Sequence, residues 1–181
     1  MMGMRKLKVT VVLGIALATG ACGFNLRDSA PLPVVMSTVA IEAVDLDSAL
    51  VVDLERELES AGATLKPLGS AGASTLKIQT ETAERNVISL DDRAKVGEYQ
   101  LIYRVIYAVE GADGKPLLND TPVEVSRVYS FDEQQAIGAG QEEDIIRTEL
   151  RRDVVRMMME RLQRIQDPNK AVETRESATA K

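Results

Sequence analysis

Apolar and polar side chains alternate over residues 97–110, and this is the clearest pattern in the chain. Six odd-numbered positions are apolar or aromatic: Tyr99, Leu101, Tyr103, Val105, Tyr107 and Val109. The even-numbered positions include Glu98, Gln100, Arg104 and Glu110, mixed with Ile102 and Ile106. A period of two residues is typical of a strand that buries one face. We therefore predict a long strand whose odd-numbered face lies in the core.

Three further strands are predicted, over residues 34–42, 74–89 and 123–131. Their expected faces are Val35, Val39 and Ile41 in the first, Leu76 and Ile78 with Thr80 and Thr82 in the second, and Val123, Val125, Tyr129 and Phe131 around Arg127 in the third. We predict a charged turn over residues 91–95. Residues 111–122 contain many glycine, proline, asparagine and aspartate residues, so we predict a long hairpin loop there.

Two segments have the four-residue spacing of an amphipathic helix. The first should start at Asp45 or Asp47, carry a stripe of Leu46, Leu50, Leu54 and Leu58 widened by Val51 and Ala61, and end at Gly62. The second should run from about 141 to 166, after Gly138 and Gly140, with Glu142, Glu143 and Asp144 at its positive end. Its stripe is Ile146, Leu150, Val154, Met158 and Leu162, widened by Ile145, Met157 and Ile165.

These elements predict an α+β fold. Each helix has one wide apolar stripe and each strand has one clearly apolar face, so a two-layer sandwich satisfies both patterns. We expect two helices packed on one face of a roughly four-stranded, mixed, mainly antiparallel sheet. The opposite sheet face should be half-polar and uncovered. Residues 34–166 would then be a single domain, and residues 167–181, which are polar and lack periodicity, a disordered tail.

The first 21 residues are typical of a secretory signal peptide. Arg5, Lys6 and Lys8 precede an apolar run over residues 9–17, and small residues lead to Cys22, the only cysteine. This order predicts removal of residues 1–21 and attachment of a diacylglyceryl group to Cys22, which would anchor the chain in a membrane. Residues 22–33 would be a tether. The alternative is an ordinary signal peptide followed by an incidental cysteine.

Charge and composition restrict the function. Loss of residues 1–21 removes three basic residues and no acidic one, so the formal charge changes from −6 to −9. A net negative surface argues against nucleic acid as a partner. The chain has no histidine, so the commonest general base and transition-metal ligand is missing. We expect a protein that is not an enzyme, with no cofactor other than the covalent lipid on Cys22.

Three stretches of the chain are similar to a known family in their order and spacing. They are Cys22-Gly23-Phe24-Asn25-Leu26-Arg27-Asp28, Gly97-Glu98-Tyr99-Gln100-Leu101 and Val128-Tyr129-Ser130-Phe131-Asp132, the last followed by the acidic start of the second helix. Together they resemble the lipopolysaccharide-assembly lipoprotein family LptE. The resemblance implies a lipoprotein on the periplasmic face of the Gram-negative outer membrane. It also implies a body that plugs the LptD barrel, helps that barrel assemble and supports lipopolysaccharide delivery to the outer leaflet.

The resemblance also implies candidate ligand contacts. Basic side chains near the sheet's loops would meet lipopolysaccharide phosphates, and here Arg93 and Lys95 occupy the turn before Gly97. The other interpretation of this pair is a solvated hairpin turn. For the whole chain, the alternative function is an accessory lipoprotein subunit of another outer-membrane barrel-assembly or envelope-scaffold complex.

Overall fold

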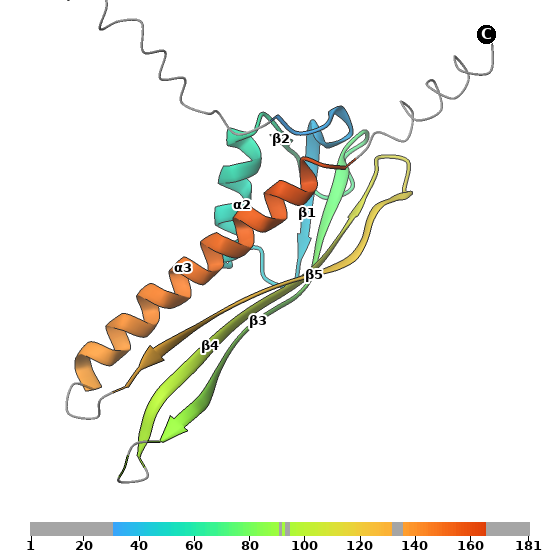
Figure 1. Ribbon diagram of the computed structural model, residues 1–181. Coiled ribbons are helices and arrows are strands. Elements are labelled where there is room, and N and C mark those ends of the chain that lie inside the picture. Colours follow the sequence, from blue (N-terminus) through green and yellow to red (C-terminus); the bar gives the residue numbers. More distant parts are fainter. Residues whose placement is uncertain (1–30, 91, 93–94, 132–135, 166–181) are drawn as a thin grey trace, which may run out of the picture.

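Three long strands form an antiparallel meander that dominates the molecule (Figure 1). In this computed structural model, which describes residues 31–90, 92, 95–131 and 136–165, they are β3 (Ser74–Leu90), β4 (Val96–Glu110) and β5 (Pro116–Ser130). Strand β1 (Thr38–Ala43) pairs parallel to β3, and the two-residue strand β2 (Thr64–Leu65) pairs parallel to β1. The sheet order is β2-β1-β3-β4-β5.

Both helices pack on one face of this sheet, so the predicted α+β fold is confirmed (Figure 1). They are α2 (Ala49–Ser60) and α3 (Ala136–Leu162). The sheet has five strands instead of the expected four, because Thr64 and Leu65 pair with Thr38 and Val39. A strand of two residues is too short to show a period, so its pairing cannot be recognised in the sequence. No helix among the described residues is long and apolar enough to cross a membrane.

The predicted core face of β4 is confirmed. Leu101, Val105, Tyr107 and Val109 are completely buried, and Tyr103 is 4% exposed. Strand β4 has a hydrogen-bonded neighbour on each side, so its backbone groups are satisfied along its length. Its odd-numbered side chains lie under the helices, and burial of these residues positions the rest of the sheet.

The predicted face of β3 is wrong beyond Ile78. Ile78 pairs with Tyr107 but Thr80 pairs with Ile106, so an extra residue at Gln79 forms a β-bulge. Beyond the bulge, even-numbered side chains of β3 lie on the face of the sheet that they would not otherwise occupy. Thr80 and Thr82 therefore share the open face of the sheet, and Glu81 points to the helix side instead.

The first predicted strand begins later than expected. Residues Val34–Met36 form a short 3₁₀-helix, and the strand starts at Thr38. Met36 is completely buried because the 3₁₀ turn directs it into the core. The Ser74 hydroxyl donates a 2.6 Å hydrogen bond to the carbonyl of Val35 and holds this turn against β3.

The long loop predicted over residues 111–122 is also wrong, because β5 already starts at Pro116. The hairpin is short: the Gly111 amide donates to the Lys115 carbonyl at 2.8 Å, and Gly114 has a φ of +76° that favours glycine. The loop was predicted partly because this segment contains Pro116 and Pro122. Both are tolerated because β5 is an edge strand, where an amide on the outer side has no ladder partner.

Helix α2 is capped by Ser48 and not by Asp45 or Asp47. The Ser48 hydroxyl accepts a hydrogen bond from the Val51 amide at 3.3 Å. Asp45 instead accepts one from the Asp47 amide at 2.9 Å, within the preceding turn. Because the helix starts at Ala49, Leu46 lies outside the stripe and is 57% exposed. The remaining stripe of Leu50, Val51, Leu54 and Leu58 is buried as expected.

Helix α3 starts at Ala136, five residues before the predicted start. Gly138 and Gly140 therefore lie inside the helix and do not precede it. The stripe from Ile146 to Leu162 is buried as predicted, but Ile145 is 60% exposed. Val155 and Met159 are buried in addition, at 3% and 5% exposure, because α3 runs diagonally across the sheet and its contact face rotates along its length (Figure 1).

Candidate functional site

The three site residues predicted from the sequence are only partly within the described chain. Cys22 and Arg93 lie outside the described residues, as do the leader, most of the tether and the tail over residues 167–181. Lys95 is described and exposed, directly before β4 at the narrow end of the molecule. The lipid anchor and the lipopolysaccharide contact therefore stay predictions.

No described element covers the open face of the sheet, opposite the two helices (Figure 1). Its centre is the even-numbered side of β4, where Ile102 and Ile106 are half-buried and Arg104 is exposed. Polar side chains pair across the strands on this face. The Arg104 Nε lies 2.7 Å from Glu124, the Lys77 Nζ lies 2.7 Å from Glu110, and the Gln100 amide lies 3.2 Å from the Ser126 hydroxyl.

The charges on the open face are mostly acidic. The register places five acids and two bases there: Glu42, Glu84, Glu98, Glu110 and Glu124 with Lys77 and Arg104. The hydrogen bond with Glu110 raises the pKa of Lys77 above its usual value, with a smaller contribution from the charge of Glu42. The surface is therefore polar, largely satisfied by its own pairs, and negative.

The helix side of the sheet carries ion pairs that the sequence interpretation did not predict. Glu143 on α3 accepts hydrogen bonds at 2.8 Å from Arg85 on β3, from the Tyr129 hydroxyl on β5 and from Arg147. Arg85 also lies over the Tyr99 ring, 4.5 Å from its centroid. Burial raises the pKa of Glu143, but the three donors outweigh it and the pKa lies below its ordinary value. This cluster fixes the first half of α3 to the far part of the sheet.

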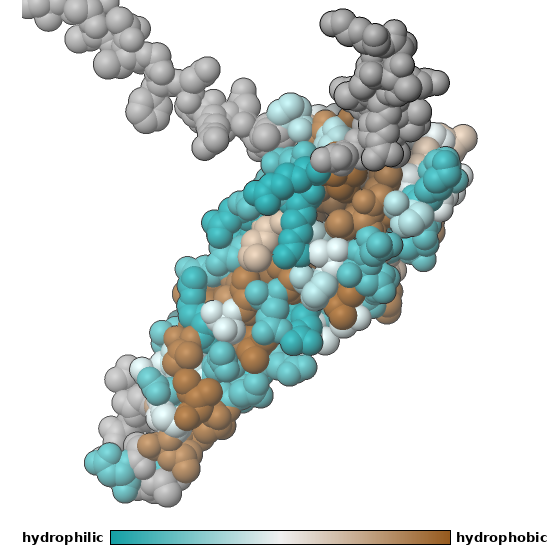
Figure 2. All heavy atoms as spheres, turned by 45° about the vertical axis from the view of Figure 1, so that its right-hand side comes forward, coloured by the Kyte–Doolittle hydropathy of each residue, from teal (hydrophilic) through white to brown (hydrophobic). Residues whose placement is uncertain are grey.

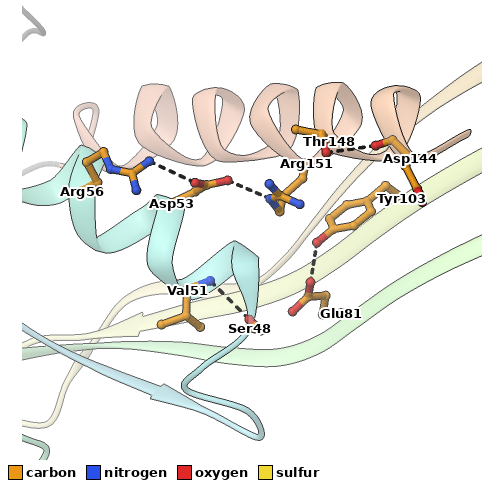
Figure 3. A network of polar contacts seen from close by, with 9 residues as sticks. All are labelled: Ser48, Val51, Asp53, Arg56, Glu81, Tyr103, Asp144, Thr148 and Arg151. Carbon is orange, nitrogen blue, oxygen red and sulfur yellow. Dashed lines mark hydrogen bonds and ion pairs between the residues drawn. The ribbon is translucent and has the colours of Figure 1, made fainter. Parts of the chain in front are cut away.

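A second group of ion pairs lies between the two helices (Figure 3). Arg151 on α3 lies 2.7 Å from Asp53 on α2, and both side chains are 19% exposed. Below them, the Tyr103 hydroxyl donates to Glu81, and burial together with this bond raises the pKa of Tyr103. The β3 bulge places Glu81 on the helix side, so this contact was not visible in the alternation of the sequence.

A cleft of about 530 Å³ opens beside the first turn of α2. Its lining includes Asp45, Ser48, Glu81 and Tyr103. The described residues contain no group of three or more His, Cys, Asp or Glu side chains placed to hold a metal ion. The Tyr103 hydroxyl in this lining is bonded to Glu81, but its raised pKa keeps it protonated at neutral pH, so it is not an activated nucleophile.

Aliphatic side chains gather at the narrow end of the molecule (Figure 2). Val87, Ile88 and Leu90 of β3 are between 46% and 61% exposed, and Val128 of β5 and Ile145 of α3 are 46% and 60% exposed. Exposed apolar side chains that cluster mark an interaction site more often than scattered ones do. Lys95 also lies at this end. The narrow end is therefore a second candidate interaction surface, in addition to the open face.

Solved structures share this fold. Lipoprotein B from Nitrosomonas europaea superimposes with a TM-score of 0.66 at 23% identity, covering 78% of this chain and 90% of that one. The rare lipoprotein B from Shewanella oneidensis gives a TM-score of 0.56 at 21% identity, covering 80% and 99%. At these identities the likeness extends to the fold alone.

Sequence relatives cover almost the whole chain. The LPS-assembly lipoprotein LptE of Photorhabdus laumondii is 27% identical over 170 residues, which is 92% of this chain and 91% of the relative. The LptE of Pectobacterium atrosepticum is 26% identical over 184 residues, covering 98% of each. The family model described as LptE, lipopolysaccharide-assembly, matches residues 36–162, from the first buried methionine to the end of α3. This chain therefore belongs to the LptE family of lipopolysaccharide-assembly proteins.

Proposed function

We propose that this chain is an outer-membrane lipoprotein, anchored through Cys22, that plugs an LptD-like barrel and helps it assemble for lipopolysaccharide delivery. The observation that carries the proposal is the open sheet face, which is polar, uncovered among the described residues and supported from behind by the two helices. The lumen of a large outer-membrane barrel is also polar. A rigid body with satisfied polar groups on its surface can fill such a lumen without burying an unpaired charge.

The charge of the open face favours a lumen with basic side chains. Five acids against two bases on this face match a positive wall better than a negative one. Arg104 lies at the centre of the face, on the central strand of the meander, and is paired with Glu124. The substitution Glu124→Arg would place a second positive charge beside Arg104 and would also weaken the attraction of this face to a basic wall.

The test is co-purification of the full-length chain with an LptD-like barrel from outer membranes. We expect the barrel to be recovered with the unaltered chain and to be lost with Glu124→Arg. The matched control is Glu160→Arg on the outer surface of α3, where the glutamate is 55% exposed and also pairs with one arginine. Equal recovery with both variants would contradict an interface on the open face.

The identity of the recovered barrel distinguishes the proposed function from its alternative. Recovery of a different barrel-assembly protein, without an LptD-like one, would favour an accessory subunit of another envelope complex. Recovery of no barrel under conditions that keep the chain folded would reject the plug role.

A further inference from the structure

The outer edge of β5 has one part that is blocked against a further strand and one part whose backbone groups are open to pairing. The Phe131 amide donates to the Gly97 carbonyl at 2.9 Å, so residue 131 faces β4. The pairing with β4 is continuous from Tyr107 opposite Thr121 to Glu98 opposite Ser130. The backbone N–H and C=O groups of successive residues in a strand point to opposite sides. The backbone groups of odd-numbered residues from 123 onward therefore point toward β4, and those of even-numbered residues from 122 to 130 point away from the sheet.

The part of the edge near the hairpin is closed. Pro122 has no amide hydrogen on the outer side, and its carbonyl accepts a 2.9 Å hydrogen bond from Arg161 on α3. Pro116 closes the start of the strand in the same way. At the opposite edge of the sheet, β2 is only two residues long. These are the devices by which proteins prevent another strand from pairing with a sheet edge.

The far part of the same edge has none of these devices. The backbone groups that point outward here belong to four exposed residues, none of which is a proline: Glu124, Ser126, Val128 and Ser130. Among the described residues no strand lies beyond them in the sheet order. Each therefore presents an amide donor and a carbonyl acceptor that have no partner strand, over a length of edge equal to an ordinary strand.

We propose that residues 124–130 receive an extended strand of the barrel protein by β-strand addition. This proposal rests on the proposed plug function and specifies how the partner is held. Only an extended polypeptide offers alternating donors and acceptors at the spacing of this edge. The added strand needs amide hydrogens at its inward-facing positions and an apolar side chain beside Val128, which is 46% exposed.

A second copy of this chain fits the edge less well than the barrel does. Pairing of two copies would extend one sheet into the other and place two acidic open faces side by side. A strand from a partner with basic side chains continues the sheet without this repulsion. The aliphatic end around Val87 and Leu90 lies on β3, which β4 and β5 separate from the added strand, so strand addition leaves this patch exposed.

Amide hydrogen exchange at single-residue resolution tests the proposal directly. In the isolated full-length chain, the amides of Glu124, Ser126 and Val128 should exchange fast, and those of Val125 and Arg127 slowly. In the purified complex with the barrel, we expect the three fast amides to slow at least tenfold. A complex that forms while these amides stay fast overturns the inference and leaves the plug function standing. Slow exchange in the isolated chain, or protection that depends on its own concentration, also overturns it, because the edge is then filled by this chain.

A proline substitution gives an independent test. Ser126→Pro removes an outward amide without breaking the ladder to β4, as Pro122 already does. The matched control is Ser126→Ala, which loses the same side-chain contact with Gln100 and keeps the amide. We expect Ser126→Pro to weaken barrel binding about tenfold relative to Ser126→Ala, with a similar thermal midpoint. Equal binding by the two folded variants overturns the inference. If Ser126→Pro does not fold, the exchange measurement decides.

Discussion

At the scale of single residues, two tyrosines on the same face of β4 have different hydroxyl environments. Tyr103 donates to Glu81, whereas the buried Tyr107 hydroxyl makes no hydrogen bond of good geometry with a described residue and lies near the Arg161 guanidinium. Burial raises the pKa of Tyr107, and the nearby Arg161 guanidinium lowers it only in part. The alternation of β4 predicted that both rings are buried. It contained no information about their hydroxyl groups, because the partners come from β3 and α3.

Replacement of each tyrosine by phenylalanine separates these two environments. We expect Tyr103→Phe to lower the free energy of unfolding by about 1 kcal/mol, because a hydrogen bond is lost. Tyr107→Phe should leave it unchanged or raise it by up to about 1 kcal/mol, because a buried hydroxyl without a hydrogen bond of good geometry is removed. Denaturant titration of both variants measures this. Equal losses would show that the Tyr107 hydroxyl has a partner in solution.

The Glu143 cluster predicts a pH dependence of stability. The pKa of Glu143 is below its ordinary value of 4.5 in the folded chain. The folded state therefore binds fewer protons here than the unfolded state does. The stabilisation is complete above about pH 4.5 and is lost as the pH falls through the folded pKa.

Glu143→Gln isolates this contribution. At pH 7 we expect the variant to be less stable by about 1.5–3 kcal/mol, the range for hydrogen bonds to a charged group. The difference should shrink as the pH is lowered below 4.5, since protonation gives the unaltered chain a neutral side chain as well. Denaturant titrations at several pH values measure it. A stability difference that does not vary with pH would mean that the hydrogen bonds from Arg85 and Arg147 are equally strong to charged and neutral Glu143.

At the scale of elements, the errors of the sequence interpretation have a common cause. The loop over residues 111–122 was predicted from two prolines that an edge strand tolerates, and the start of α3 was placed after two glycines that lie inside it. Proline and glycine mark an element boundary only on average. Whether a boundary occurs depends on what lies beside the backbone at that position. Pro122 lies on the outer edge of the sheet, and Gly140 lies next to open space.

A pair of glycine substitutions tests the corrected boundaries. Gly140 lies within α3, and a methyl group added there meets nothing within 4 Å, so Gly140→Ala should raise the free energy of unfolding by about 0.5–1 kcal/mol. Gly114→Ala should lower it by about 1 kcal/mol, because Gly114 has a φ of +76° in the hairpin turn. Thermal or denaturant unfolding measures both. Destabilisation by Gly140→Ala would contradict a helix that starts at Ala136.

At the scale of the whole molecule, family membership determines the class of function. The LptE family consists of non-enzymatic assembly lipoproteins, which confirms the prediction that the chain is not an enzyme. The chain also has no histidine. Its candidate working parts are the open sheet face, the outer edge of β5, the narrow end near Lys95 and the predicted anchor.

The predicted anchor has a direct test. Mass spectrometry of the chain extracted from membranes should find an N-terminal Cys22 heavier by a diacylglyceryl group, in place of residues 1–21. Cys22→Ala should release the chain from the membrane fraction and leave the thermal midpoint of the domain unchanged, since the residue lies outside every described element. An unmodified thiol would support the alternative of an ordinary signal peptide.

The role of the turn before β4 is tested by a charge-reversal pair. If Arg93 and Lys95 contact lipopolysaccharide, Arg93→Glu with Lys95→Glu should abolish binding of purified lipopolysaccharide while the barrel complex still forms. The control is Lys115→Glu in the other hairpin, where the lysine is 79% exposed and pairs with Asp113. Loss of the barrel complex instead would assign the turn to the plug interface, and no effect on either would leave it a solvated turn.

The sequence by itself determined which faces of its regular segments are buried. The period of two in β4 and the four-residue spacing in α2 and α3 follow from local backbone geometry, so Leu101, Leu54 and Val154 could be assigned to the core without a structure. Residues 31–165 also contained enough such faces to predict two helices over one sheet.

Only the tertiary structure decided what happens where segments meet. The bulge at Gln79 reverses the faces of β3, Glu143 joins three elements, and the position of β5 at the sheet edge makes its prolines acceptable. Each of these depends on partners that are far away in the sequence. The candidate interaction surfaces are of this kind, because an edge or an open face exists only once the neighbours of every strand are known.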